Sequence, residues 1–188
     1  MFSFLNTIQS IAPLPEASQQ ALGALAREVR FPKGYRLFEA GKICRKVYFI
    51  QQGIARAYCY NDETELTFWF GAEGDIILSY NSYAYRKPGY EHIELLEDAV
   101  LSEVPGEALE ALYASDIHMA NWGRKLAEQE LIKTEERFIS RQFRTATERY
   151  AELLQHTPHL LQRVQLGHIA SYLGVTQVTL SRIRAAIR

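Results

Sequence analysis

The pattern of hydrophobic and polar residues predicts a chain that is helical at both ends and strand-rich in between. Residues 16–29 place apolar side chains at helical spacing, which predicts a short helix. From residue 31 to residue 105, glycines separate short runs of aromatic and β-branched residues, as is typical of strands. The clearest predicted strands are residues 47–50, 55–60 and 66–70, with Asn61-Asp62-Glu63 as a hairpin turn. Short strands at this spacing predict a β-sandwich or small barrel.

A long helix is predicted after this strand region. Pro105 suits the first position of a preceding short helix, and Asp116 suits the N-cap of a longer helix that reaches Phe138 or a little beyond. The apolar residues of the long helix occupy two neighbouring faces: Ile117, Ala120, Ala127, Leu131 and Phe138 on one, and Met119, Trp122 and Leu126 on the other. Two interpretations remain open. The helix either lies between its own domain and a second protein surface, or it is a long core helix.

Three short helical segments are predicted beyond Thr145, and the last two are joined very closely. They cover residues 146–155, residues 166–173 and a segment that opens with Thr176 as its N-cap. Gly174 fits a left-handed C-cap, and Ala170 is small enough for a crossing helix to approach. Two helices separated only by Gly174-Val175 cannot lie antiparallel, so they are predicted to cross steeply as a helix-turn-helix. We expect the last segment to be anchored by Val178, Leu180, Ile183 and Ile187.

The charge distribution supports a nucleic-acid-binding C-terminal end. Residues 137–188 contain eight arginines, no lysine and two acidic residues, a net charge of +6, whereas residues 1–136 carry −7. Such an asymmetry is typical of a chain with one end facing nucleic acid. Several residues of the last helix are predicted to face outward. Among them, Gln can pair with adenine, Arg can pair with guanine, and hydroxyl groups can contact phosphate or base. These candidate DNA-binding residues are Thr176, Gln177, Thr179, Ser181, Arg182 and Arg184.

Several other classes of function are disfavoured. Cys44 and Cys59 form no CxxC pair and cannot supply the four thiolates of an iron–sulfur cluster. Of the five histidines only His92 lies in the strand region, so a cupin-like metal site lacks ligands. No phosphate-binding or nucleophile motif is present. We therefore expect no enzyme activity, catalytic residue, metal or cofactor. Without a basic leader or an apolar run long enough to cross a bilayer, a cytoplasmic protein with no membrane contact is expected.

At family level, the C-terminal segment VQLGHIASYLGVTQVTLSRIR resembles the helix-turn-helix of Crp/Fnr-type bacterial transcription regulators. Three upstream segments, FPKGYRLFEAG, VYFIQQGIARAY and GDIILSY, resemble the cyclic-nucleotide-binding-like β-roll of the same family. The resemblance implies an α+β fold with a jelly-roll effector domain at residues 1–114, a dimerisation helix at 115–140 and a winged helix-turn-helix at 141–188. Any wing is expected around residues 160–165. The predicted dimer-helix residues are Ile117, Trp122, Ala127 and Leu131.

The same resemblance implies a homodimer whose two recognition helices bind a palindromic site in double-stranded DNA, with RNA polymerase as a candidate further partner. Transcription would be set by an effector in the roll.

The candidate effector pocket departs from the cyclic-nucleotide pattern. Ser79 stands where the family has a Glu for the ribose, and Tyr90-Glu91 fall near its Arg-Ser pair for the phosphate, where an acidic residue would repel the ligand. The resemblance therefore implies an effector other than cyclic AMP, or an unused pocket, and the oxygen-sensing cysteines of some members are absent. Gln177-Val178 replace the Arg-Glu of well-known relatives while Arg182 is retained, so a different operator is expected. The candidate pocket residues are Ser79, Tyr80, Asn81, Arg86 and Tyr90.

Alternatives to a ligand-sensing DNA regulator remain open at this stage. The tyrosines at 80, 83, 85 and 90 are either the lining of a pocket for a planar ligand or ordinary barrel-core and surface residues. The roll is either a sensor or only a scaffold. A small-molecule-binding roll, cupin-like or scaffolding, whose helix-turn-helix contacts another protein is the main alternative to a DNA-binding regulator.

Overall fold

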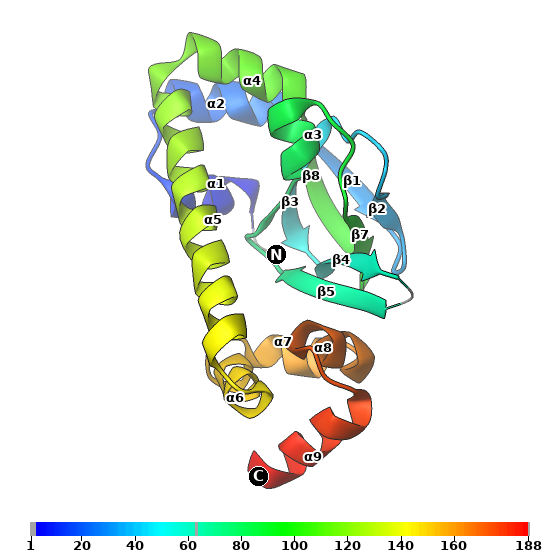
Figure 1. The fold of residues 1–188 in the computed structure, drawn as a ribbon. Coiled ribbons are helices and arrows are strands. Elements are labelled where there is room, and N and C mark those ends of the chain that lie inside the picture. Colours follow the sequence, from blue (N-terminus) through cyan, green and yellow to red (C-terminus); the bar gives the residue numbers. More distant parts are fainter. Residues whose placement is uncertain (1–2, 63, 188) are drawn as a thin grey trace. The chain divides into compact units, whose positions relative to one another are not determined.

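The structure is a computed structural model that describes residues 3–62 and 64–187 (Figure 1). The chain forms two compact units. The first unit comprises Met1–Ala57 and Phe70–Glu130, and the second comprises Tyr58–Trp69 and Leu131–Arg188.

Two helices open the first unit, α1 (Phe4–Ile11) and α2 (Glu16–Leu25). The helix predicted for residues 16–29 is therefore too long by four residues. In place of its last turn, strand β1 (Arg27–Phe31) pairs antiparallel with the last strand of the roll, from Arg27 opposite Glu103 to Phe31 opposite Ala99. The sheet hydrogen bonds decide the conformation here, because local spacing of apolar residues is only a weak preference.

The strand region forms a roll of two four-stranded sheets among the described residues, with strand orders β1-β8-β3-β6 and β2-β7-β4-β5. The predicted jelly-roll architecture is confirmed, and the three clearest predicted strands fall within β3, β4 and β5. Asp62 in the predicted hairpin turn has φ 54°, and Glu63 lies outside the described residues. The remaining strands are β2 (Arg36–Phe38), β3 (Lys46–Gln52), β4 (Ala55–Asn61), β5 (Thr64–Gly71), β6 (Ile76–Ile77), β7 (His92–Leu95) and β8 (Ala99–Pro105).

The core of the first unit lies where the helices cover strand β3. Phe49 on β3 is buried with Ile8 of α1, Leu22 of α2 and Leu109 of α4 (Gly106–Ser115). Trp122 is 1 % exposed in the same cluster, and its indole Nε1 donates to the carbonyl of Ile8 at 2.9 Å. A buried indole with a satisfied N–H fixes one end of the long helix against the roll.

Pro105 ends strand β8 and pairs with Lys46, so it precedes α4 as the N-cap rather than opening the helix as predicted. Between β6 and β7 the chain forms a short helix, α3 (Tyr80–Tyr85), which the sequence analysis did not predict. The residue that ends α3, Arg86, adopts a left-handed conformation with φ 54°.

The long helix α5 (Ile117–Phe143) has the predicted N-cap. The Asp116 carboxylate accepts the N–H groups of His118 at 2.8 Å and Met119 at 3.4 Å, and it also accepts the Ser18 hydroxyl at 2.6 Å. The Ser18 hydrogen bond and these two N–H bonds lower the pKa of Asp116. The helix continues to Phe143, consistent with the predicted end at Phe138 or a little beyond.

The second unit continues with α6 (Ala146–His156), α7 (Pro158–Arg163), α8 (Leu166–Leu173) and α9 (Gln177–Ile187). Helix α7 occupies the segment where a wing was expected, because Pro158 starts a helical turn whose Leu160 is buried. The described residues from 144 onward contain no strand, so the expected wing at 160–165 is wrong for this part of the chain.

Candidate nucleic-acid interface and effector site

The turn between α8 and α9 is fixed by its own backbone. Gly174 has φ 68° and ψ 35°, and its N–H donates to the carbonyl of Ser171 at 3.1 Å, while the N–H of Val175 donates to Ala170 at 3.0 Å. The Thr176 hydroxyl then accepts the N–H of Thr179 at 3.2 Å and starts α9. The predicted left-handed C-cap and N-cap are both confirmed. Each satisfies backbone groups that helix ends leave free, so the turn holds a defined geometry.

The inner face of α9 is smaller than predicted. Leu180 and Ile183 are buried, but Val178 is 63 % exposed and Ile187 is 38 % exposed, so these last two residues do not anchor the helix in the chain itself. At 100° per residue, Val178 points away from the side that carries Leu180 and Ile183. Val178 was predicted to anchor the helix, but it is an exposed residue of the first turn.

All six predicted DNA-binding residues, Thr176, Gln177, Thr179, Ser181, Arg182 and Arg184, are exposed. They do not all point the same way. The hydroxyls of Thr176 and Thr179 lie 3.0 Å apart within the cap. The Gln177 amide lies over α8, since a Cβ added to Gly167 would stand 2.6 Å from its Nε2 atom. Helical geometry places Ser181 and Arg182 beside Val178 on the side opposite the buried residues.

Several arginines of the basic segment stabilise the fold. Arg149 on α6 donates to the carbonyl of Leu173 at 2.6 Å and to that of Arg144 at 2.6 Å, and so it ties the end of α8 to the start of α6. Arg144 is ion-paired with Glu152. By contrast, Arg182 and Arg184 form no ion pair with any described residue and remain available to a ligand.

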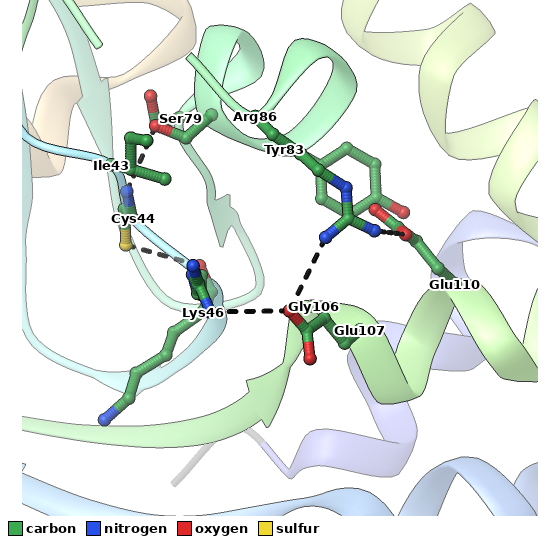
Figure 2. A pocket seen from close by; sticks show the side chains of 11 residues that line it. Ile43, Cys44, Lys46, Ser79, Tyr83, Arg86, Gly106, Glu107 and Glu110 are labelled. Carbon is green, nitrogen blue, oxygen red and sulfur yellow. Dashed lines mark hydrogen bonds and ion pairs between the residues drawn. The ribbon is translucent and has the colours of Figure 1, made fainter. Parts of the chain in front are cut away.

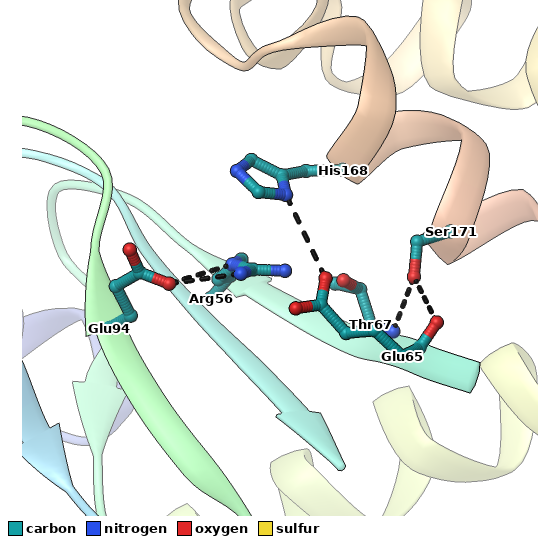
Figure 3. A network of polar contacts seen from close by, with 6 residues as sticks. All are labelled: Arg56, Glu65, Thr67, Glu94, His168 and Ser171. Carbon is teal, nitrogen blue, oxygen red and sulfur yellow. Dashed lines mark hydrogen bonds and ion pairs between the residues drawn. The ribbon is translucent and has the colours of Figure 1, made fainter. Parts of the chain in front are cut away.

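The strand segment of the second unit contacts α8 through Ser171. The Ser171 hydroxyl accepts the N–H of Thr67 at 2.9 Å and donates to the carbonyl of Glu65 at 2.9 Å (Figure 3). His168, one turn earlier on α8, places Nδ1 4.0 Å from the Glu65 carboxylate. The polar side of the first helix of the motif is thus engaged within its own chain.

In the first unit, the predicted effector residues do not share one pocket. Ser79 and Arg86 line the same hollow (Figure 2), but Tyr80 and Tyr90 are exposed, and the Asn81 amide donates to the carbonyl of Pro88 at 3.2 Å. The tyrosines of this stretch are therefore mainly surface residues. The other residues lining the hollow include Ile43, Cys44, Lys46, Ser82, Tyr83, Glu107 and Glu110.

Arg86 already has acidic partners. Its guanidinium lies 2.7 Å from Glu110 and 3.5 Å from Glu107, both on α4. Arg86, one of the candidate pocket residues, is therefore already ion-paired within the chain.

Glu91 is the buried acidic residue of this region. It is 6 % exposed, and a Cβ added to Gly89 would meet its carboxylate oxygens at 3.0 and 3.1 Å and the Ser79 hydroxyl oxygen at 2.6 Å. The Ser79 hydroxyl is buried and has no hydrogen-bond partner among the described residues. Ser79 and Glu91 therefore both lie close to Gly89, in the segment between α3 and β7.

Comparisons with known proteins agree with this architecture. The family described as "Cyclic nucleotide-binding domain" matches residues 28–116. The fumarate and nitrate reduction regulatory protein of Vibrio cholerae serotype O1 is 25% identical over 171 residues, covering 85% of this chain and 68% of that protein.

Two solved structures share the fold. FixK2 from Bradyrhizobium japonicum has a TM-score of 0.75 at 22% identity and covers 86% of this chain and 84% of its own. A transcriptional regulator of the crp/fnr family from Eubacterium rectale has a TM-score of 0.72 at 19% identity, with coverage of 93% and 85%.

The fold and the site together define a class of protein in which a cyclic-nucleotide-binding-type roll is joined by a long helix to a helix-turn-helix. Residues 28–116 match the cyclic nucleotide-binding domain family, and the chain as a whole is similar to regulators of the Crp/Fnr type. In the described part of the chain, no helix has the length and hydropathy needed to cross a membrane. Within residues 3–62 and 64–187, no group of three or more His, Cys, Asp or Glu side chains could hold a metal ion.

Proposed function

We propose that this protein binds double-stranded DNA as a homodimer, reads a palindromic operator with α9, and regulates transcription in response to an effector other than cyclic AMP. The observation that carries the proposal is the Gly174 turn, which holds α9 in place and leaves Ser181 and Arg182 exposed. The protein would act in the cytoplasm, without catalysis, and RNA polymerase would be its further partner. The proposed division is an effector domain at residues 1–114, a dimer helix at 115–140 and a DNA-binding domain at 141–188.

The exposed side of α9 supports direct contact with base edges. Arg182 can form two hydrogen bonds with guanine, and the Val178 side chain is suited to the methyl group of thymine. Thr176, Gln177, Thr179 and Arg184 flank this centre and are suited to phosphate or base contacts. The major groove is about 12 Å wide and accommodates a helix that carries such side chains.

The exposed apolar residues of α5 support the proposed dimer. Ile117 and Leu131 are 70 % and 69 % exposed, and Ala127 lies on the same side. A long helix that leaves this many apolar side chains in water has a face suited to a second copy. Trp122 does not belong to that face, because it is buried in the core of the first unit. The exposed apolar residues in the later part of α5 are Leu131, Ile132, Phe138, Ile139 and Phe143.

The decisive experiment is selection of DNA from a random pool, repeated with and without cyclic nucleotides. We expect an enriched palindrome whose selection is unchanged by cyclic AMP. A pool without any enriched sequence would contradict DNA recognition.

The selected operator then allows Arg182 to be tested. Arg182→Ala is expected to weaken specific binding by about 1–3 kcal/mol, since it removes one bidentate base contact. Arg30→Ala removes an exposed arginine from β1 and serves as the matched control, with no expected loss. Affinity should also fall steeply with added salt because bound phosphates release counterions. A flat salt response would instead favour the alternative in which the helix-turn-helix contacts protein.

Dimerisation is tested by a charge on the exposed face of α5. Leu131→Glu is expected to shift the protein to a monomer in sedimentation velocity, because the carboxylate would be buried without a partner. Lys133→Glu, on the opposite side of the helix, is the control and should remain dimeric. If both variants stay dimeric, the proposed face is not the interface.

A further inference from the structure

We infer that Arg141, near the end of the long helix α5, binds a phosphate group of the DNA backbone beside the helix-turn-helix. The inference rests on the proposed DNA-binding function and adds a contact from a residue outside α8 and α9. It depends on three features. These are the position of Arg141 beside the turn, the lack of an acidic partner among the described residues, and a cluster of arginines that an anion would stabilise.

Arg141 stands next to the turn that joins α8 and α9. A Cβ added to Gly174 would lie 3.6 Å from the Nη2 atom of the Arg141 guanidinium. Arg149 holds the two segments together, because it donates to the carbonyl of Arg141 at 3.4 Å and to that of Leu173 at 2.6 Å. Hydrogen bonds within the second unit thus place the end of α5 against the end of α8.

Two further arginines lie close to Arg141. Burial raises the pKa of the Tyr172 hydroxyl on α8, and three positive charges oppose this rise, those of Arg137, Arg141 and Arg149. Arg137 and Arg141 are also one helical turn apart on α5, a spacing at which like charges repel each other. A bound anion would relieve this repulsion.

Arg141 is the member of this cluster that is available to a ligand. Arg137 donates to the Thr134 hydroxyl at 2.9 Å, and Arg149 donates to backbone carbonyls. The Arg141 side chain is exposed and forms no ion pair with any described residue. The residues three and four positions before and after it in the sequence are not acidic; they are Arg137, Phe138, Arg144 and Thr145. The charge of Arg141 therefore remains for a partner outside the chain.

The place of the turn favours a DNA phosphate as that partner. A recognition helix meets the base edges with its N-terminal residues, so the sugar-phosphate backbone passes close to the residues just before the helix. Here those residues are Gly174 and Val175, and Thr176 caps the helix. A guanidinium suits a phosphate, because it can form two parallel hydrogen bonds with it. Arg141 would hold the backbone while α9 contacts the bases.

The first test compares the original protein with Arg141→Ala on two duplexes, the selected operator and a random sequence. We expect both affinities to fall by a similar factor of about ten, because a phosphate contact carries no sequence information. The salt dependence over ~50–200 mM should become less steep by about 1.8 in logarithmic slope, since a dimer loses two contacts of about 0.9 each. Arg30→Ala is the control and should bind as the original protein does.

A second test locates the contact on the DNA. Each backbone phosphate of the operator is replaced in turn by a neutral methylphosphonate, which leaves the bases unchanged. One position in each half-site should weaken binding of the original protein but not weaken Arg141→Ala any further, because both changes remove the same interaction. Arg141→Lys keeps the charge without the paired hydrogen bonds and should lose less than alanine. Hydrogen exchange of the α8 amides verifies that the variants retain the turn.

Several results would overturn the inference. These are unchanged affinity in Arg141→Ala, a loss confined to the operator, an unchanged salt slope, or additive losses at every methylphosphonate position. Saturable binding of inorganic phosphate at Arg141, with duplex affinity unchanged in Arg141→Ala, would assign the residue to a free anion and also contradict the DNA contact.

These failures are separate from a failure of the proposed function, because each of them leaves operator selection by the original protein intact. If Arg141→Ala weakens binding to the random duplex but no operator is enriched, the phosphate contact stands and the sequence-specific regulator does not. A protein that binds neither duplex contradicts both.

Discussion

Replacement of Gly174 tests whether the conformation of one residue sets the geometry of the helix-turn-helix. Gly174 has φ 68°, and an added Cβ would meet only the Arg141 side chain, at 3.6 Å. That distance is an ordinary van der Waals contact, so Gly174→Ala introduces no clash. The cost comes from the left-handed backbone, about 1–2 kcal/mol for a residue with a Cβ. The lower freedom of the unfolded chain offsets about 0.4–1 kcal/mol of it.

The expected net loss for Gly174→Ala is therefore about 1 kcal/mol, which corresponds to a roughly fivefold larger equilibrium constant for opening of the turn. Native-state hydrogen exchange at the amides of Val175 and Leu180 measures this locally. That is preferable to one melting temperature, since the chain has two compact units. Gly174→Asn should lose less, because asparagine tolerates the left-handed region better than alanine.

The matched control is the same substitution in an ordinary helical position. Gly23 lies in α2, and a Cβ added there would have no neighbour within 4 Å. Gly23→Ala should therefore stabilise α2 by about 0.5–1 kcal/mol. If Gly174→Ala leaves exchange unchanged, or if asparagine and alanine cost the same, the left-handed backbone does not control this turn.

Two further predictions concern α6 and the core. Hydrogen bonds from the N–H and hydroxyl of Thr145 hold the pKa of Glu148 below its ordinary value of 4.5. The contribution of Glu148 to α6 should therefore be complete above pH 4.5 and be lost as the pH falls through the lower pKa of the folded state. Exchange of α6 amides between pH 7 and pH 3 measures it, and Glu148→Gln should remove the pH dependence; an unchanged profile in that variant would contradict this role. Trp122→Ala should cost about 3–5 kcal/mol in chemical unfolding of the first unit while the protein remains dimeric in sedimentation, and a stable monomer would instead place Trp122 at the interface.

The sequence was sufficient to predict features that depend on local chemistry. Gly174, Thr176 and Asp116 were assigned as caps because each residue type satisfies backbone groups at a helix end, and all three assignments are confirmed. Strands β3, β4 and β5 of the roll followed from the alternation of glycines with aromatic and β-branched runs. These signals depend on residues that are close in the sequence.

The features that were wrong depend on contacts between distant residues. The first three residues of β1 were predicted as helix because its partner strand, β8, is more than sixty residues away in the sequence. Trp122 was placed on the dimer face because periodicity cannot show that α1 covers it through Ile8. In the effector region, the sequence could not show that Arg86 is ion-paired, because its partners Glu107 and Glu110 come from α4. The burial of Glu91 and Val178's exposure likewise depend on tertiary packing.

The Ser171 hydroxyl also has a consequence for solubility. β5 is the last strand in its sheet order, and such a strand exposes backbone groups that can pair with other chains and start aggregation. Ser171 satisfies one N–H and one carbonyl of this strand, at Thr67 and Glu65, with a single side chain. A side chain cannot continue a ladder of backbone hydrogen bonds. Ser171 therefore blocks the part of the β5 edge where a strand of another chain would attach. Release of α8 would leave the protein prone to strand-mediated self-association.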